Sequence, residues 1–432
     1  MSKNNENEEI VVVSAVRTPF GKFGGAMKNI DVYDLGAKAM HESIARIGLS
    51  PDMIDEVWWG CGDTTNCKDP YTPVVARQSL IKAGLPVSTP SITFDKACVS
   101  AMSAAYYAMG RIKSGEVDVV LAGGATSFST VPYLARNLRW KGNKAGGITL
   151  EDPLFPLGYK DFAPVAVDSG NVAVRYKVSR EEQDELSYNS HQKYGRAYMN
   201  GFFKKEMMPL DIAVKKGKSI EKIRLDIDEQ YRPKVTLADL TQLKTIFGNP
   251  TVTAGNAPGL NDGAAAQILM SKGTADKLHL KPLYTIVGMC SIAANADLLP
   301  VAPALAIKKC LNKLNMSIDE IDILEINEAF ACVPLVSCKL LSCKNFIEEN
   351  YKETLNKIGN YPLDGFQEDQ YKKLIGKLNV NGGAIAIGHA NTASGARIMM
   401  TAAEELRQRG GGVAVCAICG GLTQGDACII KV

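Results

Sequence analysis

The sequence predicts an α/β fold of two similar halves, with a further segment laid over them. Short apolar runs alternate with stretches of helical spacing, the order of these elements occurs twice, and residues 130–260 differ in composition from both halves. Strands that alternate with helices are typical of mostly parallel sheets covered by helices. We therefore expect such a sheet in each half.

The first half starts with the apolar run Ile10–Ser14, which predicts a buried strand. Apolar residues at helical spacing predict a helix at 35–48, and Val57–Gly60 is expected to form the next strand. The half closes with Val117–Gly124, an apolar run that ends in glycine.

The second half repeats this order. A helix is predicted at 303–314, a strand at 323–326 and a closing strand at 412–421, which again runs into glycine. The tetrapeptides Ile54–Val57 and Ile318–Ile321 both begin Ile-Asp-Glu and occupy matching places in the two halves. The shared order of elements indicates an internal duplication.

The segment between the halves carries more charge and several prolines and glycines. It contains one clear helix, from Ser179 to Asn200. Ser179 and Glu182 have the spacing of a capping box, which predicts where this helix begins. We expect the segment to form a lobe over the α/β body.

Composition excludes several classes of protein. Of 432 residues, 46% are hydrophobic and 22% charged, which is ordinary for a globular chain with a large core. A net charge of +3 gives no basic field for nucleic acid. No apolar run is long enough to span a membrane, and Met1–Glu9 is polar, unlike a signal peptide. The odd count of 11 cysteines favours reduced thiols in a cytoplasm.

Most of these cysteines are expected to be small buried hydrophobes. This applies to Cys290, Cys310, Cys416 and Cys428. Cys338 and Cys343 are spaced too widely for a zinc site and have no second pair, so no metal site is predicted.

Cys98 differs from the others in its position. It follows an apolar strand and precedes a predicted helix of small and apolar residues at 99–109. The positive end of a helix dipole stabilises a thiolate, so this position predicts a lowered pKa and a nucleophilic thiol. The alternative is a structural cysteine buried at a strand–helix junction.

His389 is one of only four histidines and lies in a glycine-rich turn, Asn381–His389. Glycines allow close backbone packing and positive φ angles there. An imidazole so placed can take a proton from a thiol near neutral pH. A structural or solvated histidine is the alternative.

Cys419 and Asn327 are further candidates. Cys419 begins the segment Cys-Gly-Gly, whose small residues leave room and free N–H groups beside the thiol. Asn327 follows the predicted strand at 323–326, where an amide can hold a water or donate to an oxyanion. An Asx turn explains Asn327 equally well.

Together these segments resemble the thiolase family along nearly the whole chain. The matching stretches, in order, are Val13–Gly21, the Cys98 turn, Ala122–Gly124, Ser179–Asp184, Thr253–Asn256, Asn261–Ala265, Asn327–Ala331, Asn381–His389, Ser394–Arg397 and Cys419–Ala427.

The resemblance implies a five-layer α-β-α-β-α body built from duplicated halves, plus a loop domain that covers the coenzyme A site. It divides the chain into an N-terminal half at 1–129, the loop domain at 130–261, a return to the N-terminal half at 262–282 and a C-terminal half at 283–432. A homodimer or tetramer is the family's usual assembly.

The resemblance also implies the role of each candidate. Cys98 carries the acyl group, His389 deprotonates it, and Cys419 moves a proton at the α-carbon of the second acyl-CoA. Asn327 holds a water that forms one oxyanion hole with His389, and the backbone N–H groups of Cys98 and Gly421 form the other. Two half-reactions through an acyl-enzyme imply ping-pong kinetics, with coenzyme A as a substrate and no bound cofactor.

Arg232 matches a position that approaches the coenzyme A nucleotide, and Pro258 replaces a serine that is often near coenzyme A. Pro164–Ala166 replaces the His-Met-Gly of short-chain acetoacetyl-CoA thiolases, whose histidine lines the acyl pocket. This favours a larger, less polar acyl group. Other departures from the family pattern are Ala101, Thr126, Ala390 and Thr392.

An insert at about 338–372 lengthens the connection between Asn327 and Asn381. A connection that long is expected to hold structure of its own. Helical spacing predicts a helix with an apolar stripe, which docks on this chain's body or on another subunit. The residues of the stripe are Phe346, Ile347, Tyr351, Leu355 and Ile358. Some thiolase-like proteins work with a small zinc-containing OB-fold subunit, which we retain as a hypothesis.

Two other functions compete with that of a thiolase. A decarboxylating condensing enzyme of the ketoacyl-synthase type mostly needs a histidine or asparagine where this chain has Cys419. A non-catalytic acyl-CoA-binding subunit is disfavoured by the presence of Cys98, His389, Cys419 and Asn327 together.

Overall fold

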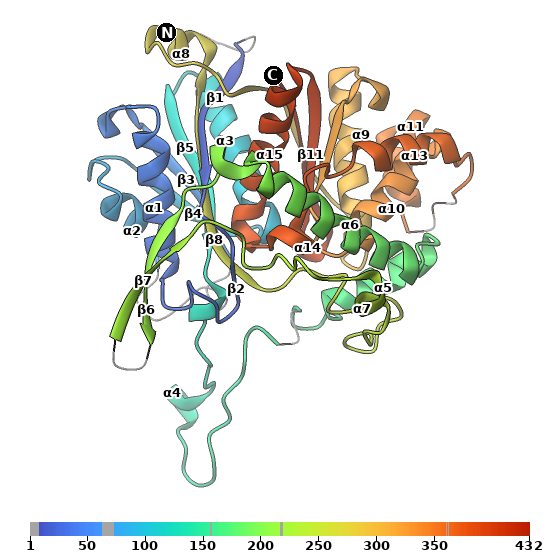
Figure 1. The fold of residues 1–432 in the computed structure, drawn as a ribbon, viewed down its shortest axis with the longest axis horizontal. Helices are drawn as coiled ribbons and strands as arrows, with labels where there is room; N and C mark the ends of the chain where they lie inside the picture. The colour runs from blue at the N-terminus through green and yellow to red at the C-terminus, as the bar shows by residue number, and fades with distance from the viewer. Residues whose placement is uncertain (1–7, 63–72, 156–157, 217–218, 360, 362) are drawn as a thin grey trace.

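The computed structural model describes residues 8–62, 73–155, 158–216, 219–359, 361 and 363–432 (Figure 1). Most of the polar N-terminal stretch lies outside these residues. No helix in the described part of the chain combines the length and apolarity needed to cross a bilayer.

The strands of the two halves follow the same spatial order. In the N-terminal half this order is β1 (Ile10–Arg17), β8 (Asn261–Ser271), β5 (Val119–Thr126), β3 (Glu56–Cys61) and β4 (Ser91–Phe94), with β2 (Gly21–Lys22) beside β8. In the C-terminal half it is β9 (Tyr284–Ala293), β12 (Gln424–Lys431), β11 (Val413–Gly420) and β10 (Ile323–Ile326). The common order confirms the duplication.

The register of the repeat differs from the one predicted. The Asp55 N–H donates to the Val119 carbonyl at 3.0 Å, and the Asp55 carboxylate accepts a bond from the Val119 N–H at 2.9 Å. Asp322 makes the same contacts with Val413. Asp55 therefore corresponds to Asp322, three residues beyond the aspartate of the predicted match, and the resemblance of the two Ile-Asp-Glu tetrapeptides is a coincidence.

The prediction of mostly parallel sheets is wrong. Parallel pairing in the described residues joins β3 to β4 and β5, and β10 to β11. Pairings that involve β1, β8, β9 and β12 are antiparallel. β1 pairs with β9 through three residues, which joins the strands of both halves into one ten-stranded sheet.

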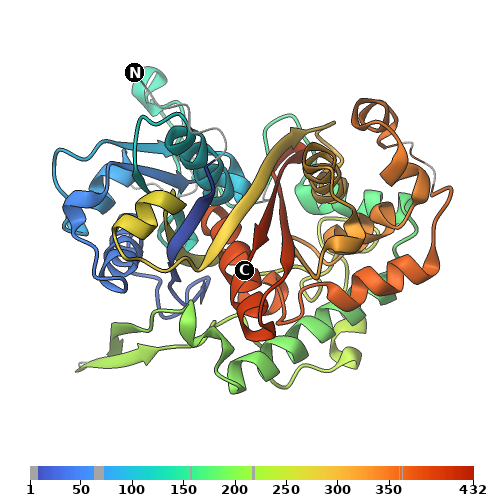
Figure 2. The same ribbon diagram turned by 90° about the horizontal axis from the view of Figure 1, so that it is seen from above.

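The helices form three layers around these strands. α3 (Ser100–Lys113) and α15 (Ser394–Arg409) lie between the strands of the two halves, as Figures 1 and 2 show. α1 (Val32–Ala45) and α2 (Val75–Lys82) cover the outer face of the N-terminal strands. α9 (Ala302–Leu314) covers that of the C-terminal strands, with α10 (Cys332–Leu341) beside it. This is the predicted five-layer arrangement.

Alternation along single strands explains the layers. In β1, Val11 and Val13 pack toward the outer helices, whereas Ile10 and Val12 pack toward the central pair. Successive side chains of a strand point to opposite faces, so an unbroken apolar run is buried on both sides. The four cysteines expected to be small buried hydrophobes are indeed buried.

The middle segment lies over one end of this body. It contains α4 (Leu138–Lys141), α5 (Val165–Arg175), α6 (Arg180–Met199), the hairpin of β6 (Leu210–Lys216) and β7 (Ser219–Leu225), and α7 (Leu237–Thr241). The capping box of α6 is confirmed: the Glu182 N–H donates to Ser179 Oγ at 3.1 Å, and the Ser179 N–H donates to Glu182 Oε2 at 2.7 Å. The chain around α4 extends away from the body in Figure 1.

Short helices complete the described chain. They are α8 (Lys272–Lys277), α11 (Lys344–Glu348), α12 (Tyr351–Lys357), α13 (Glu368–Lys377) and α14 (Ala384–Ile387).

The insert folds onto the chain's own body. The single predicted helix is two, α11 and α12, because Asn350 starts a new helix by accepting a hydrogen bond from the Lys352 N–H. The apolar stripe of the insert packs against the core that also contains α9. Lys308 of α9 is buried and donates to the carbonyl of Phe346 and to Thr354, which fixes both helices to the body.

A buried ion cluster joins the middle segment to β1. Arg17 donates to Glu206 Oε1 at 2.6 Å and to both oxygens of Asp228, at 2.7 and 3.0 Å. Tyr194 of α6 also donates to Asp228, at 3.0 Å. The charges are almost fully buried, so each depends on its partners to offset the loss of water.

We expect Arg17→Met to lower the free energy of unfolding by about 3–5 kcal/mol, because two buried carboxylates lose their cation. Urea denaturation followed by circular dichroism measures this. Lys82→Met is the matched control, since Lys82 pairs with Asp34 at 2.6 Å on the exposed surface, where ion pairs contribute about 1 kcal/mol or less. Equal losses in the two variants would contradict the role of the buried cluster.

Candidate active site

A strained turn presents Cys98. After β4 the chain makes a single 3-10 turn, Ala97–Val99, that leads directly into α3. Ala97 has a φ of +49°, in the left-handed region, which costs a non-glycine residue about 1–3 kcal/mol. Asp95 stabilises this conformation by accepting a hydrogen bond from the Ala97 N–H at 2.7 Å. The Cys98 side chain then faces a pocket.

The same turn is attached to the C-terminal half. Lys96 Nζ donates to Asp426 Oδ1 of β12 at 2.6 Å and to Ser291 Oγ of β9 at 2.7 Å. These contacts fix the backbone two residues before the thiol against strands of the other half.

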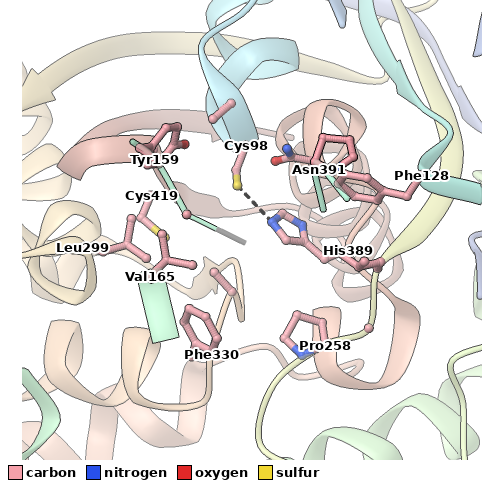
Figure 3. Close-up of a pocket in the computed structure, with 18 residues that line it drawn as sticks. Cys98, Phe128, Tyr159, Val165, Pro258, Leu299, Phe330, His389, Asn391 and Cys419 are labelled. Carbon is pink, nitrogen blue, oxygen red and sulfur yellow. Dashed lines mark hydrogen bonds between the residues drawn. The ribbon is translucent and has the colours of Figure 1, made fainter. Parts of the chain in front are cut away.

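His389 approaches Cys98 from the C-terminal half. Its Nε2 lies 3.1 Å from Cys98 Sγ, as Figure 3 shows. The preceding Gly388 has a φ of +108°, and a Cβ there would collide with Asn261, so only glycine fits. Asn261 Oδ1 in turn accepts a hydrogen bond from the His389 N–H at 2.8 Å.

Ser394 favours one tautomer of His389. Its hydroxyl lies 2.7 Å from His389 Nδ1 and donates to the carbonyl of Ala390 at 3.4 Å. A hydroxyl that donates to this carbonyl accepts from Nδ1, which favours the tautomer with its proton on Nδ1. In that tautomer Nε2 is unprotonated and faces the Cys98 thiol.

The predicted lowering of the Cys98 pKa is wrong. Burial raises the pKa of Cys98 to about 12, since it outweighs the favourable contact with the residue's own backbone N–H. Burial and the positive charge of Arg397 lower the pKa of His389 to about 3. At neutral pH the pair is therefore a thiol beside a neutral imidazole.

Cys419 lies at the same pocket. It is near the end of β11, opposite Gly425 of β12, and is fully buried. Burial, followed by the nearby charge of Cys98, raises its pKa well above the ordinary value. Figure 3 shows Cys419 beneath Tyr159, on the far side of the pocket from His389.

The pocket encloses about 140 Å³ and is lined mainly by apolar side chains. The lining includes the predicted Cys98, His389, Cys419, Gly421 and Pro258. Residues that the sequence analysis did not select are also present: Phe128, Pro153, Tyr159, Leu299, Phe330 and Asn391. The sequence predicts Pro164 at the place where short-chain relatives have a pocket-lining histidine. In the structure the neighbouring Val165 lines the pocket instead.

Two predicted residues lie outside the lining. Asn327 follows β10 and is buried, and its Oδ1 accepts a hydrogen bond from Arg397 Nη2 at 3.1 Å. Arg232 is exposed on the loop after β7, where its backbone N–H donates to His191 Nδ1 at 3.3 Å. Its contact with coenzyme A stays a prediction.

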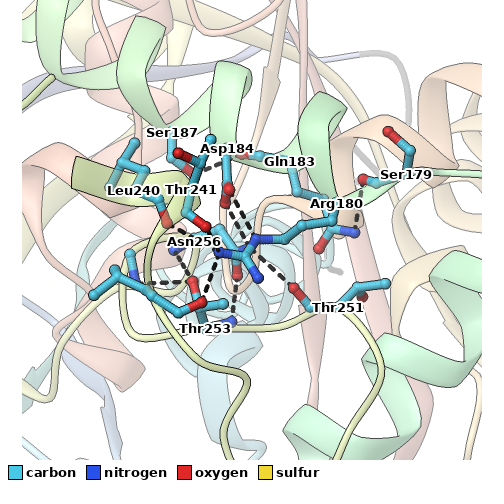
Figure 4. Close-up of polar contacts among 12 residues, drawn as sticks. Ser179, Arg180, Gln183, Asp184, Ser187, Leu240, Thr241, Thr251, Thr253 and Asn256 are labelled. Atoms are coloured by element: carbon cyan, nitrogen blue, oxygen red, sulfur yellow. Dashed lines mark hydrogen bonds and ion pairs between the residues drawn. The ribbon is translucent and has the colours of Figure 1, made fainter. Parts of the chain in front are cut away.

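A polar network holds the wall that contains Pro258. Asp184 of α6 accepts hydrogen bonds from Arg180 at 2.7 Å and from Asn256 Nδ2 at 3.0 Å (Figure 4). Asn256 Oδ1 accepts from the Thr253 N–H at 2.8 Å, and its carbonyl accepts from the Ala331 N–H at 2.8 Å. The loop is thereby fixed both to α6 and to the start of α10.

Comparison with known proteins agrees with this geometry. The thiolase N-terminal domain model matches residues 10–273, and the thiolase C-terminal domain model matches residues 280–432. A β-ketoadipyl-CoA thiolase of Pseudomonas knackmussii is 36% identical over 437 residues, covering 98% of this chain and 99% of the relative. An acetyl-CoA acetyltransferase of Chromobacterium violaceum is 34% identical, with 98% and 99% coverage.

Solved structures give the same result. Human mitochondrial 3-ketoacyl-CoA thiolase superposes with a TM-score of 0.85 at 34% identity, covering 98% of this chain and 99% of that one. The same human enzyme in complex with CoA gives a TM-score of 0.82 at 33% identity, with 98% coverage of both chains. The chain belongs to the thiolase family of acyltransferases, which use coenzyme A thioesters.

Proposed function

We propose that this thiolase transfers an acyl group between coenzyme A thioesters through an acyl-Cys98 intermediate. The observation that carries the proposal is the 3.1 Å contact between Cys98 Sγ and His389 Nε2, in a pocket that also contains Cys419. A nucleophile, its base and a second thiol at one site are what two successive acyl transfers require.

Cleavage begins at the 3-oxo carbonyl of a 3-oxoacyl-CoA. As Sγ of Cys98 bonds to this carbon, its proton passes to His389 Nε2. The C2–C3 bond then breaks, and the electron pair stays on C2 of the departing acyl-CoA enolate. Cys419 donates its proton to C2, which releases acetyl-CoA and leaves the shortened acyl group on Cys98.

The second half-reaction returns the acyl group to coenzyme A. The thiol of coenzyme A passes its proton to the Cys419 thiolate as its sulfur attacks the acyl-Cys98 carbonyl, and the Cys98 sulfur leaves and regains its proton from His389. In the direction of condensation the same groups act in reverse, and Cys419 removes the α-proton of the second acyl-CoA.

Charge that develops on oxygen needs donors in both steps. The backbone N–H groups of Cys98 and Gly421 serve one step, and His389 with a water on Asn327 serves the other. Each set contributes about 3 kcal/mol to the lowering of the barrier.

The lining supports an apolar acyl group larger than acetoacetyl. Val165, Leu299 and Phe330 contribute apolar surface, and no cationic side chain lines the described part of the pocket. The cavity of about 140 Å³ is close in size to one that holds benzene. The apolar wall offers no partner for a terminal carboxylate, which the β-ketoadipyl group would bring.

Four further points are proposals. The chain forms a homodimer or tetramer, it works with an OB-fold partner, it is cytoplasmic, and it divides into the four parts given above. The exposed edge strand β4, with Ile92 45% exposed, supports an interface with another chain, since an open sheet edge favours pairing.

Replacing Cys98 and replacing Cys419 should have different effects. Cys98→Ala should abolish the acyl adduct that mass spectrometry detects after incubation with acyl-CoA. Cys419→Ser should still form the adduct but should lose at least about 100-fold in exchange of the acetyl-CoA α-protons with deuterated water, because its proton carrier is missing. Exchange at the wild-type rate in Cys419→Ser would refute the role of Cys419.

The pKa values predict how alkylation of Cys98 depends on pH. Since His389 stays neutral above about pH 3, the wild-type rate with iodoacetamide should be nearly constant from pH 5 to about pH 9. In His389→Gln the thiol must ionise alone against a pKa raised to about 12, so the rate should rise about tenfold per pH unit. Peptide mapping identifies the alkylated cysteine, and a flat profile in His389→Gln would exclude His389 as the base.

The apolar pocket predicts the order of substrates. Values of kcat/KM should be higher for 3-oxohexanoyl-CoA than for acetoacetyl-CoA and lowest for 3-oxoadipyl-CoA, whose distal carboxylate would be desolvated without a partner. Leu299→Lys should raise the value for 3-oxoadipyl-CoA relative to 3-oxohexanoyl-CoA, and Leu299→Met is the matched control. A wild-type preference for 3-oxoadipyl-CoA would contradict the substrate assignment.

A further inference from the structure

Arg397 is a fully buried cation beside the active site. It lies on α15, and its Nη2 donates to Asn327 Oδ1 at 3.1 Å, while Nη1 is 3.5 Å from Glu325 Oε2. Neither Nε nor Nη1 has a hydrogen-bond acceptor among the described residues. Burial of an arginine so sparsely paired destabilises the fold, so stability alone does not account for this side chain.

The contact fixes which way the Asn327 amide faces. A guanidinium group only donates hydrogen bonds, so it can pair with Oδ1 and not with Nδ2. Nδ2 must then face away from Arg397. It is buried and contacts no acceptor in the part of the chain that the structure describes.

A buried donor without an acceptor destabilises the fold, and each such group in a folded protein calls for an explanation, such as a ligand or water that completes it. Asn327 lies two residues before Ala329, which lines the pocket. The free Nδ2 donor therefore belongs to a residue close in the chain to the pocket wall. Arg397, which holds the Asn327 amide, lies outside the lining.

The same face of α15 holds the base. Ser394 contacts His389 Nδ1, and Arg397 follows Ser394 by three residues, a spacing that places two side chains on one face of a helix. Cys98, from the turn before α3, contacts the imidazole, and the charge of Arg397 lowers the pKa of His389. Burial lowers the pKa of Arg397, and the charges of Glu325 and Glu206 oppose that shift.

We propose that Arg397 is a positioning residue: it orients the Asn327 amide so that Nδ2 donates toward the reacting oxygen, or toward a water bonded to it, in line with the imidazole held by Ser394. This inference rests on the proposed acyl transfer and assigns no chemistry to Arg397 itself. One turn of α15 then aligns both groups of one oxyanion hole.

Steady-state thiolysis of variants separates positioning from a merely structural role. Arg397→Met should lower kcat by about 100-fold, the effect of losing one oxyanion donor, with KM for the 3-oxoacyl-CoA changed less than about threefold, as expected for loss of a transition-state contact. Loss of the positive charge also raises the pKa of His389, so the acid limb of kcat/KM should move to higher pH. Arg397→Lys keeps the charge and should leave that limb in place.

Thr401→Val is the matched control. Thr401 lies one turn further along α15 and also makes a buried polar contact, donating to Glu206 Oε2 at 2.9 Å. Its loss should lower the melting temperature without moving kcat or the acid limb.

The double variant Asn327→Ala/Arg397→Met gives the decisive result. If Arg397 acts through Asn327, this variant should have the kcat of Asn327→Ala within about threefold, because coupled residues are not additive. Multiplied losses, or a normal kcat in Arg397→Met, would overturn the inference. Should Arg397→Met fail to fold, the same cycle with Arg397→Lys provides the comparison.

The positioning role of Arg397 and the proposed acyl transfer can be refuted separately. A wild-type enzyme that forms no acyl adduct on Cys98 would refute acyl transfer. An enzyme that forms the adduct and turns over, but whose Arg397 variants keep their kcat, would refute only the positioning role.

Discussion

The contact between Cys98 and His389 joins the two halves of the molecule, and the proposed active site depends on it. Neither group is reactive alone, because burial keeps the thiol protonated and the imidazole neutral. Proton transfer needs the two atoms within hydrogen-bond reach, and the distance of 3.1 Å is set by elements nearly 300 residues apart in the chain. The fold must therefore fix one half against the other with little freedom.

Three features provide that rigidity. β1 and β9 pair directly, α3 packs against α15 between the strands of the two halves, and Lys96 reaches from the turn that carries Cys98 to Asp426 on the other half. The first two are backbone pairing and apolar packing, which set the overall arrangement. The lysine contact is local. It fixes the strained turn that carries Cys98 directly against the other half, in addition to the pairing of the strands.

Features of the fold that are encoded locally could be predicted from the sequence. The strand Ile323–Ile326 has the predicted bounds, and the capping box at Ser179 marks the start of α6. The turns around Cys98, His389 and Cys419 were identifiable because a thiol or imidazole among small residues is unusual. Features that depend on distant partners could not be predicted. The antiparallel placement of β8 and β12 and the true register of the repeat at Asp55 and Asp322 are of this kind.

The same limit explains the error about Cys98. Local sequence shows a helix N-terminus, which favours a thiolate, but it does not show how much of the residue's surroundings is apolar. Burial is the larger effect here. The pocket wall was missed for a similar reason, since Tyr159, Phe128 and Leu299 belong to no motif and meet only in the folded chain.

Polar residues along α15 connect the site to the rest of the molecule. Ser394 contacts His389, Arg397 contacts Asn327, and Thr401 contacts Glu206, which pairs with Arg17 of β1. Spacings of three and four residues place all three on one helix face. Apolar side chains there would pack a central helix at least as well, because paired buried ions rarely stabilise more than apolar residues of the same volume. What Ser394 and Arg397 add is direction: each of their contacts has a donor and an acceptor in fixed positions, whereas apolar packing tolerates small rotations. The proposed alignment of a thiol, an imidazole and an amide from separate segments requires the directional constraint that these two residues provide.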